Sequence, residues 1–168
     1  MNLPETYRIL IVTLSDRASR GEYEDISGPR AGELAADFFK SIDAKFTITF
    51  QLLPDEPELL RSKILDASHR HDIIITTGGT GIGPRDITPD TVRPLLSMEL
   101  PGIMEHIRVK FGAEKPTALL SRSIAGVIGR CLIYTLPGSV KAVNEYMGEI
   151  TKTIEHSFNM LYGTDKHK

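Results

Sequence analysis

Short runs of aliphatic and β-branched residues alternate along this chain with segments whose apolar residues recur at helical spacing. Residues 8–14 and 72–77 are almost continuously apolar or β-branched, and each run predicts a strand that is covered on both faces. In residues 46–50, Phe and Ile alternate with Thr, which is the two-residue period of a strand. The runs at 127–128 and 131–134 flank Gly129-Arg130 and predict a hairpin with a two-residue turn.

Apolar positions spaced three and four apart predict helices between these strands. The first helix is expected to begin at Ser27 as N-cap, with Pro29 in its first turn. The apolar face of this helix is formed by Ala31, Leu34, Ala35, Phe38, Phe39 and Ile42. Pro54-Asp55-Glu56 opens a second helix carrying Leu59, Leu60, Ile64 and Leu65. Further helices are expected at 89–96, 102–111 and 140–161, and the tail 163–168 is expected to be frayed.

The order of strands and helices predicts an α/β protein with a doubly wound, mostly parallel sheet, helices on both faces and a small antiparallel edge hairpin. We expect one domain over residues 1–168, with its core at about 7–160. Such sheets bind ligands outside the carboxyl ends of their strands. The loops 15–28, 53–56, 78–90 and 137–141 each follow a predicted strand, so a binding site is expected where these four loops meet.

Composition narrows the range of functions. The chain has 168 residues, of which 40% are hydrophobic, and a single cysteine, Cys131, so it can bury a full core without disulfides and fits a reducing cytoplasm. The net charge is -2 and no dense basic block is present, which argues against a nucleic-acid binder. The N-terminus lacks a signal-peptide pattern, and no apolar run approaches the roughly 20 residues that span a bilayer.

A glycine-dense segment after the third predicted strand is the most informative stretch. Gly78, Gly79, Gly81 and Gly83 occupy four of six positions and can turn backbone N–H groups toward an anion, with hydroxyls of Thr77 and Thr80 as further donors. The segment continues with Pro84-Arg85, so it is neither the dinucleotide fingerprint nor the P-loop pattern. A phosphate cradle is the interpretation we favour, and a purely flexible connection is the alternative.

Acidic and basic residues flank this segment. Asp55 and Asp86 follow two predicted strands, and carboxylates beside a phosphate cradle suit Mg²⁺. Asp90 and Glu56 are better explained as residues of helix first turns. Ser121-Arg122-Ser123 offers two hydroxyls and a guanidinium as a phosphate clamp. The candidate phosphate-binding cations on the same rim are Arg17, Arg30, Arg85, Arg122 and Lys141.

At these residues the chain resembles the MogA/MoaB family of molybdenum-cofactor biosynthesis, which includes the plant and gephyrin G-domains. The resemblance covers roughly residues 7–160. The segments that carry it are Leu14-Ser15-Asp16-Arg17-Ala18-Ser19, Ser27-Gly28-Pro29-Arg30, Leu53-Pro54-Asp55-Glu56, Thr77-Gly78-Gly79-Thr80-Gly81, Pro84-Arg85-Asp86-Ile87-Thr88-Pro89, Leu120-Ser121-Arg122-Ser123, Ala125-Gly126, Leu136-Pro137-Gly138-Ser139 and Lys141-Ala142.

The resemblance implies the adenylylation of molybdopterin with MgATP, which releases pyrophosphate. It also implies a homotrimer or a hexamer built from two trimers, with hand-over of the product to a molybdenum insertase. Asp55 and Asp86 are then the metal-linked catalytic acids, and Gly78 to Gly81 hold phosphate. The ligand cleft would be lined by Ser15, Asp16, Arg17, Ser27, Gly28, Arg30, Thr77, Arg85, Ser121, Arg122, Ser123, Pro137, Gly138, Ser139 and Lys141.

Two alternatives stay open at this point. Molybdenum insertases and CinA-type hydrolases contain related sheets, but they carry additional domains for which we expect no room in 168 residues. A binding-only module that sequesters molybdopterin or serves as a scaffold is the other alternative. Release of pyrophosphate from molybdopterin and MgATP would distinguish the enzyme from the binder.

Overall fold

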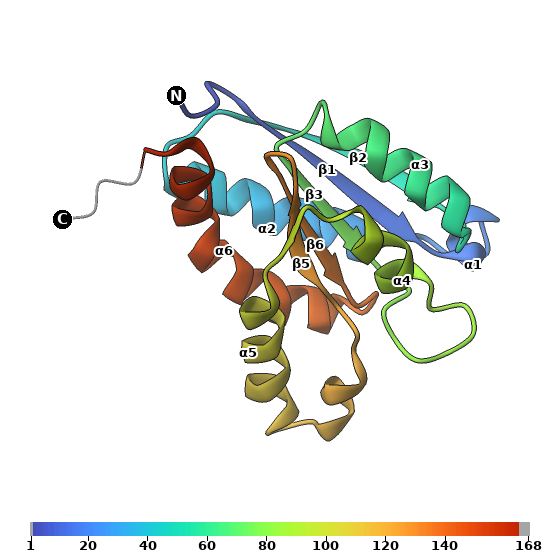
Figure 1. Ribbon diagram of the computed structural model, residues 1–168. Coiled ribbons are helices and arrows are strands. Elements are labelled where there is room, and N and C mark those ends of the chain that lie inside the picture. Colours follow the sequence, from blue (N-terminus) through green and yellow to red (C-terminus); the bar gives the residue numbers. More distant parts are fainter. Residues whose placement is uncertain (1, 165–168) are drawn as a thin grey trace.

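A single mixed sheet organises residues 2–164, which are the residues that the computed structural model describes (Figure 1). The sheet has six strands in the order β2-β1-β3-β6-β5-β4. Four strands are parallel, namely β1 (Tyr7–Leu14), β2 (Phe46–Leu53), β3 (Ile73–Thr77) and β6 (Cys131–Leu136). The antiparallel edge consists of β5 (Ala125–Ile128) and β4 (Met98–Glu99). The predicted fold class is therefore confirmed.

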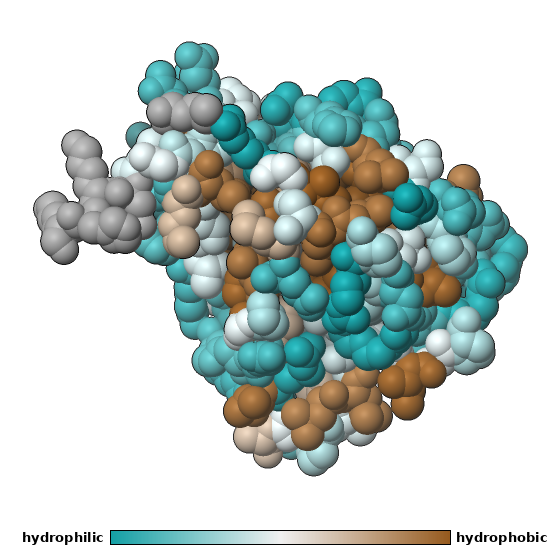
Figure 2. All heavy atoms as spheres, in the orientation of Figure 1, coloured by the Kyte–Doolittle hydropathy of each residue, from teal (hydrophilic) through white to brown (hydrophobic). Residues whose placement is uncertain are grey.

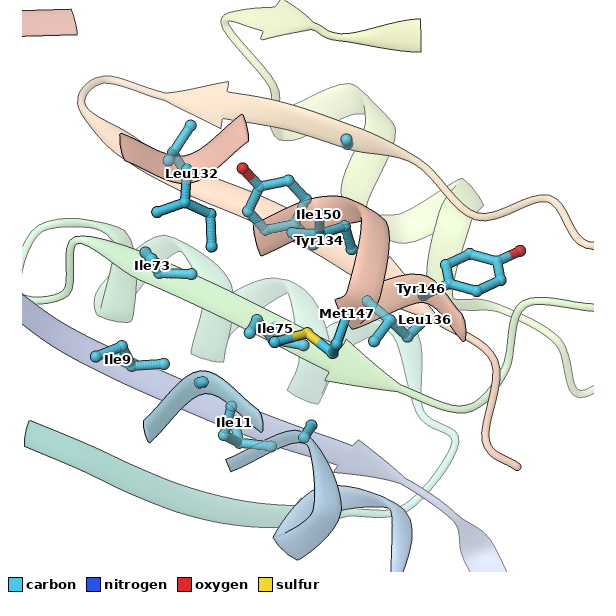
Figure 3. Close-up of a cluster of buried hydrophobic side chains, with 14 of the residues drawn as sticks. Ile9, Ile11, Ile73, Ile75, Leu132, Tyr134, Leu136, Tyr146, Met147 and Ile150 are labelled. Atoms are coloured by element: carbon cyan, nitrogen blue, oxygen red, sulfur yellow. The ribbon is translucent and has the colours of Figure 1, made fainter. Parts of the chain in front are cut away.

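Helices cover both faces of this sheet because side chains of a buried strand point alternately to its two sides. On one face, Ile9 and Ile11 of β1 pack with three helices, α2 (Ser27–Ser41), α5 (Pro101–Gly112) and α6 (Val140–Tyr162). Figure 3 shows Met147 and Ile150 of α6 lying over the strands on this side. On the other face, Leu10 and Val12 pack with α3 (Pro57–Ser68) and α4 (Thr88–Val92).

The register of the parallel strands brings their carboxyl ends to one level. Leu14 of β1 pairs with Leu53 of β2, and Thr77 of β3 pairs with Thr13 of β1 and with Leu136 of β6. All five residues of β3 are buried, as expected for a central strand covered on both faces. The loops that follow these four strands therefore meet at one edge of the sheet, as the sequence predicts.

The start of α2 differs from the prediction that Ser27 is its N-cap. Ile26 occupies the N-cap position and makes no side-chain cap hydrogen bond. The carboxylate of Asp25 instead accepts hydrogen bonds from the N–H of Gly28 and the hydroxyl of Ser27, both at 3.1 Å. A carboxylate beside the first turn of a helix satisfies free N–H groups and opposes the positive end of the helix dipole, so Asp25 takes over the capping role.

Smaller elements also depart from the predicted boundaries. The polar loop after β1 contains a helical turn, α1 (Asp16–Ser19), which Ser15 caps. The helix expected at 89–96 is divided into α4 and a 3₁₀ turn, η1 (Arg93–Leu95), because Pro94 has no N–H to continue the α-helical pattern. A second 3₁₀ segment, η2 (Pro116–Leu120), precedes β5.

The apolar face of α3 is narrower than the sequence predicts. Leu60 and Ile64, which lie one helical turn apart, are fully buried against the sheet. Leu59 and Leu65 belong to the same helix, but they are 45% and 37% exposed. A single helix covers only the stripe that faces the strands, so residues next to the central pair reach its edges and contact the solvent.

The last helix ends in a left-handed turn within the tail that was expected to fray. Gly163 has a φ of 64°, and the N–H of Thr164 donates to the carbonyl of Asn159 at 2.9 Å. Bonds of this kind close the last turn of a helix. The rest of the tail, 165–168, lies outside the described residues. None of the helices in residues 2–164 combines the length and apolar character needed to cross a membrane.

Charged side chains on α5 and α6 connect the two helices. Glu149 of α6 contacts His106 and Lys110 of α5 at 3.2 and 2.6 Å, and Lys152 on its own helix at 2.9 Å. The hydrogen bonds from Lys110 and Lys152 lower the pKa of Glu149 from 4.5 to about 2. Because the folded pKa is depressed, the stabilisation is fully present above the ordinary pKa and is lost as the pH falls toward the folded value.

We therefore expect Glu149→Gln to lower the free energy of unfolding by about 1 kcal/mol near pH 7, as for a network of surface ion pairs. The difference from the native protein should shrink between about pH 4.5 and pH 2. Denaturant unfolding followed by circular dichroism at several pH values measures it. A difference that is constant down to pH 2 would contradict the assignment.

Candidate active site

A cavity of about 570 Å³ opens at the carboxyl edge of the sheet, where the sequence places the binding site. This volume is in the range of small-molecule sites. One wall is formed by Asp86 and by residues 79–82 of the glycine loop, which is defined here as residues 78–83. The facing wall is the turn 137–139 followed by the first turns of α6, and residues 115–121, which include η2, close the third side. The predicted loops therefore do not supply every wall, since η2 belongs to none of them.

The glycine loop has a shape that only glycine allows at several positions. Gly78 and Gly79 have φ angles of 97° and 65°, which L-residues with a side chain rarely adopt. A Cβ atom on Gly81 would lie 2.7 Å from the Asp86 carboxylate, and one on Gly79 would lie 2.6 Å from the Thr88 hydroxyl. The glycines therefore let the two neighbouring side chains pack directly against loop backbone.

The predicted acidic residues gather around this loop. Asp86 lines the cavity and accepts a hydrogen bond from the N–H of Gly83 at 2.8 Å. Asp55 lies beside the loop without lining the cavity, and its Oδ1 atom would be 3.5 Å from a Cβ atom on Gly79. Both carboxylates thus lie against the same six-residue loop, Asp55 from the segment after β2 and Asp86 from the segment that follows the loop itself. This is the arrangement on which the sequence-based hypothesis depends.

Asp16 and Asp55 are joined by two reciprocal hydrogen bonds from backbone to carboxylate. The N–H of Asp16 donates to the carboxylate of Asp55, and the N–H of Asp55 donates to the carboxylate of Asp16, both at 3.0 Å. Arg85 binds the second oxygen of Asp16 with its Nε and Nη2 atoms at 2.9 and 2.6 Å. Arg85 is therefore paired within the protein, although its side chain is 61% exposed.

The electrostatic environments of these two carboxyls differ. The hydrogen bond from the N–H of Asp55, followed by that from Arg85, lowers the pKa of Asp16. Burial raises the pKa of Asp55, and the negative charges of Asp16 and Asp86 raise it further. A raised pKa means that the ionised form of Asp55 is unfavourable in the protein alone. A cation beside Asp55 would relieve that cost.

Arg122 binds the backbone of the glycine loop. Its N–H donates to the carbonyl of Thr80 at 2.8 Å, and its guanidinium donates to the carbonyls of Gly81 and Asp86 at 2.7 and 2.6 Å. The same guanidinium binds both carboxylate oxygens of Asp90. Sequence reasoning proposed Arg122 as a phosphate ligand, but its donors already fix the shape of the loop from behind.

Ser121 is held in place by a chain of hydroxyl groups. The phenol of Tyr146 donates to Ser121 Oγ at 3.0 Å, and Ser121 Oγ lies 2.9 Å from Ser123 Oγ. Arg108 donates to the carbonyls of Ser121 and Ser123. Ser121 lines the cavity, whereas Ser123 is 1% exposed and supports it from behind. Sequence reasoning missed Tyr146 and Arg108 because each also fits a regular helix pattern.

The remaining predicted residues fall into two groups. Those that line the cavity are Gly79, Thr80, Gly81, Pro137, Gly138, Ser139 and Lys141. Those that lie outside its lining are Ser15, Arg17, Ser27, Gly28, Arg30, Thr77 and Gly78. In the second group, the Ser27 and Thr77 hydroxyls are 3.0 Å apart in a buried network that includes Thr13 and Asp25. Arg17 pairs with Glu22, and Arg30 binds Asn144 and Glu33.

The rim of the cavity carries exposed apolar side chains. Ile82 of the glycine loop is 71% exposed, Leu120 of η2 is 53% exposed, and both line the cavity. Figure 2 shows apolar side chains gathered at the lower surface, where α5 and η2 lie in the same view. An apolar rim around a cavity of glycines, hydroxyls and charged groups suits a ligand with a flat ring and an anionic part.

The metal-binding capacity of the site depends on two carboxylates. Within residues 2–164, no group of three or more His, Cys, Asp or Glu side chains is placed to hold a metal ion. Asp55 and Asp86 each hold a single backbone N–H on one oxygen, which leaves the other oxygen for a ligand. Two carboxylates together with phosphate oxygens and water match the preference of Mg²⁺.

These features define the class of the protein. A doubly wound sheet, a glycine loop after its central strand and two carboxylates at the strand ends are typical of an α/β protein that binds a phosphorylated ligand. The family described as "Probable molybdopterin binding domain" matches residues 10–156. The chain belongs to this family.

Known relatives are similar over nearly all of the chain. It is 32% identical to molybdopterin adenylyltransferase of Helicobacter pylori strain J99, with 95% of this chain and 90% of the relative covered. It is 36% identical to gephyrin of Dictyostelium discoideum over 96% of this chain, and it spans 23% of that longer protein. The crystal structure of MoaB from Thermus thermophilus superposes with a TM-score of 0.81 at 36% identity, covering 94% and 97% of the two chains.

The contacts of Arg122 lead to a test of the glycine loop. Arg122→Lys keeps the charge but loses the planar fork that reaches two carbonyls and a carboxylate. We expect amide hydrogen exchange at residues 79–86 to become about tenfold faster, which corresponds to the loss of one or two hydrogen bonds to a charged group. Mass spectrometry of peptides from this segment measures the rates. Arg61→Lys, on the surface of α3, is the control, and equal exchange in all three proteins would refute the role.

Proposed function

We propose that this protein transfers the adenylyl group of ATP to molybdopterin and releases pyrophosphate. Its relatives named molybdopterin adenylyltransferase include those of Helicobacter pylori and of Escherichia coli K12, the latter 35% identical over 83% of this chain. The observation that carries the proposal is the convergence of Asp55 and Asp86 on the glycine loop beside a cavity of about 570 Å³.

The reaction makes limited demands on the protein's side chains. A terminal phosphate oxygen of molybdopterin attacks the α-phosphorus of ATP, and the bond from this phosphorus to the β-phosphate oxygen breaks. The attacking phosphate is largely dianionic at neutral pH because its second pKa is about 6, so no strong general base is needed. The main barrier is the approach of two polyanions and the charge that develops on the leaving pyrophosphate.

The chain's own groups address this barrier by position and charge. The N–H groups of the glycine loop would bind phosphate oxygens, and Arg122 keeps the loop in shape through Gly81 and Asp86. Ser121 Oγ accepts from Tyr146 and lies 2.9 Å from Ser123 Oγ. With Ser123 as the donor in that contact, the Ser121 hydroxyl would donate into the cavity. Lys141, whose side chain is 70% exposed, would add positive charge at the mouth, through which the anionic substrates enter.

Mg²⁺ would be held by Asp55 and Asp86, and it would supply neutralisation of the triphosphate charge. The raised pKa of Asp55 fits a side chain whose ionised form is stabilised by a bound cation. We further propose that the chain works as one domain in the cytoplasm and as a homotrimer, or as a hexamer built from two trimers. Its product would be handed to a molybdenum insertase.

Substitution of the two acidic residues tests the function. Asp86→Asn and Asp55→Asn should each lower turnover at least about a hundredfold, because the neutral amide binds Mg²⁺ poorly, while molybdopterin binding stays nearly unchanged. Pyrophosphate release from molybdopterin and MgATP measures turnover, and fluorescence measures pterin binding. Asp37→Asn, on the exposed side of α2, should match the native protein.

Two results would count against the proposal. Normal turnover in Asp86→Asn would remove that residue from the mechanism. A native protein that binds molybdopterin but never releases pyrophosphate would be a binding-only module rather than an adenylyltransferase.

The raised pKa of Asp55 also predicts an effect on stability. A carboxyl whose folded pKa lies above its unfolded value stabilises the fold while protonated, and this contribution is lost as the pH rises through the folded pKa. At pH 7 without Mg²⁺ or ATP, Asp55→Asn should therefore unfold at a higher temperature than the native protein, since Asn still accepts from the N–H of Asp16. Differential scanning calorimetry measures this, and a lower unfolding temperature at pH 7 would contradict it.

A further inference from the structure

Glu145 is a carboxylate in the cavity wall that the reaction chemistry does not explain. It lies on α6, one helical turn after Lys141, and lines the cavity beside Tyr146. Its side chain is 22% exposed. Within residues 2–164 its carboxylate accepts no hydrogen bond, and its only ion pair is with Lys141 at 3.6 Å. The carboxylate lines the cavity without a hydrogen-bond donor from the described residues, so a ligand that enters would be the group that supplies donors.

The ion pair with Lys141 does not account for Glu145. The lysine precedes the glutamate by four residues, which is the weaker order for such pairs on a helix. The separation of 3.6 Å is beyond hydrogen-bond length, and the lysine side chain is 70% exposed. Pairs of this kind contribute little to stability. The position of the carboxylate therefore needs another reason.

The negative charge of Glu145 restricts which part of the substrates can bind beside it. It would repel the triphosphate and the molybdopterin phosphate, which we assign to the glycine loop with Asp55 and Asp86. The remaining parts are two flat rings, adenine and pterin. The pyrimidine edge of pterin carries two adjacent donors, the ring N3–H and the 2-amino group, and they match the two oxygens of one carboxylate. The amino edge of adenine places an acceptor beside its donor, which one carboxylate oxygen would repel.

We propose that Glu145 binds the aminopyrimidinone edge of the pterin and determines the specificity for this ring. This inference rests on the proposed function. It places the pterin at the first turns of α6 and the triphosphate at the glycine loop, with Ile82 and Leu120 at the rim between solvent and the ligand rings. Of the two carboxylates that line the cavity, Asp86 would then lie near the triphosphate and Glu145 near the pterin ring.

A comparison of two pteridines tests the assignment without any turnover. Lumazine differs from pterin in carrying a 2-oxo group in place of the 2-amino group, so it offers an acceptor where pterin offers a donor. The native protein should bind pterin at least about tenfold more tightly than lumazine, because an unmatched polar group in a built site is strongly rejected. Fluorescence titration with each compound gives the two dissociation constants.

The variant Glu145→Gln should reverse this preference. Its carboxamide has one acceptor for N3–H and one donor for the 2-oxo group, so it matches lumazine and mismatches pterin. Glu145→Ala should weaken the binding of pterin without strengthening the binding of lumazine. This variant therefore separates recognition of the ring from a change in cavity shape. Glu155→Gln, on the exposed side of the same helix, should retain the native preference. In the enzyme assay, Glu145→Gln should raise the KM for molybdopterin about tenfold and leave the KM for ATP unchanged.

The outcomes separate this inference from the proposed function. If Glu145→Gln keeps the native preference for pterin while its circular dichroism is native, Glu145 does not read the ring. If the native protein shows the preference and the variant reverses it, but no pyrophosphate is ever released, pterin recognition stands and adenylyl transfer is wrong. If pyrophosphate is released and only the KM for ATP changes in the variant, the ring bound by Glu145 is adenine and the inference fails.

Discussion

Backbone pairing between parallel strands fixes the level at which β1, β2, β3 and β6 end, and the site depends on this constraint. Thr77 of β3 is in register with both Thr13 and Leu136, so the loops that follow must leave the sheet side by side. The glycine loop continues that pairing, because the N–H of Gly78 donates to the carbonyl of Leu136 at 2.9 Å. The loop therefore starts from a rigid, fully buried strand rather than from a flexible connection.

Beyond the end of the buried strand, polar contacts rather than apolar packing hold the loops in their conformation. Arg122 uses its donors on loop carbonyls and on Asp90, and Arg108 does the same for the Ser121–Ser123 segment. Guanidinium groups suit this task because their donors are planar and fixed in direction. Two arginines thus hold the backbone around the cavity in place, while Lys141 of the cavity lining is 70% exposed.

The distribution of carboxylates gives the site its polarity. Asp16, Asp55 and Asp86 lie close enough for the charges of Asp16 and Asp86 to raise the pKa of Asp55. In the proposed function, a cation and the phosphates would bind at this side of the glycine loop. Glu145 lies on the α6 wall, where its only ion pair among the described residues is with Lys141 at 3.6 Å, and this is the part of the cavity that we propose for the pterin ring. With this division of charge, a phosphorylated ring compound would bind as proposed, with its phosphate at the glycine loop and its ring at α6.

The sequence alone determined the fold class, the order of the longer helices and strands and the edge of the sheet at which the cavity opens, because periods of two and 3.6 residues and strand-terminal glycines are local properties. It also placed Asp55 and Asp86 in loops at the same edge of the sheet, although β1 lies between the two strands that precede them. Only the tertiary structure decided that Arg122 and Arg85 are engaged by the protein, that Asp25 caps α2, and that η2, Tyr146 and Glu145 complete the cavity. Those roles depend on contacts between residues far apart in the chain, such as the 25 positions between Ser121 and Tyr146, and no local pattern encodes them.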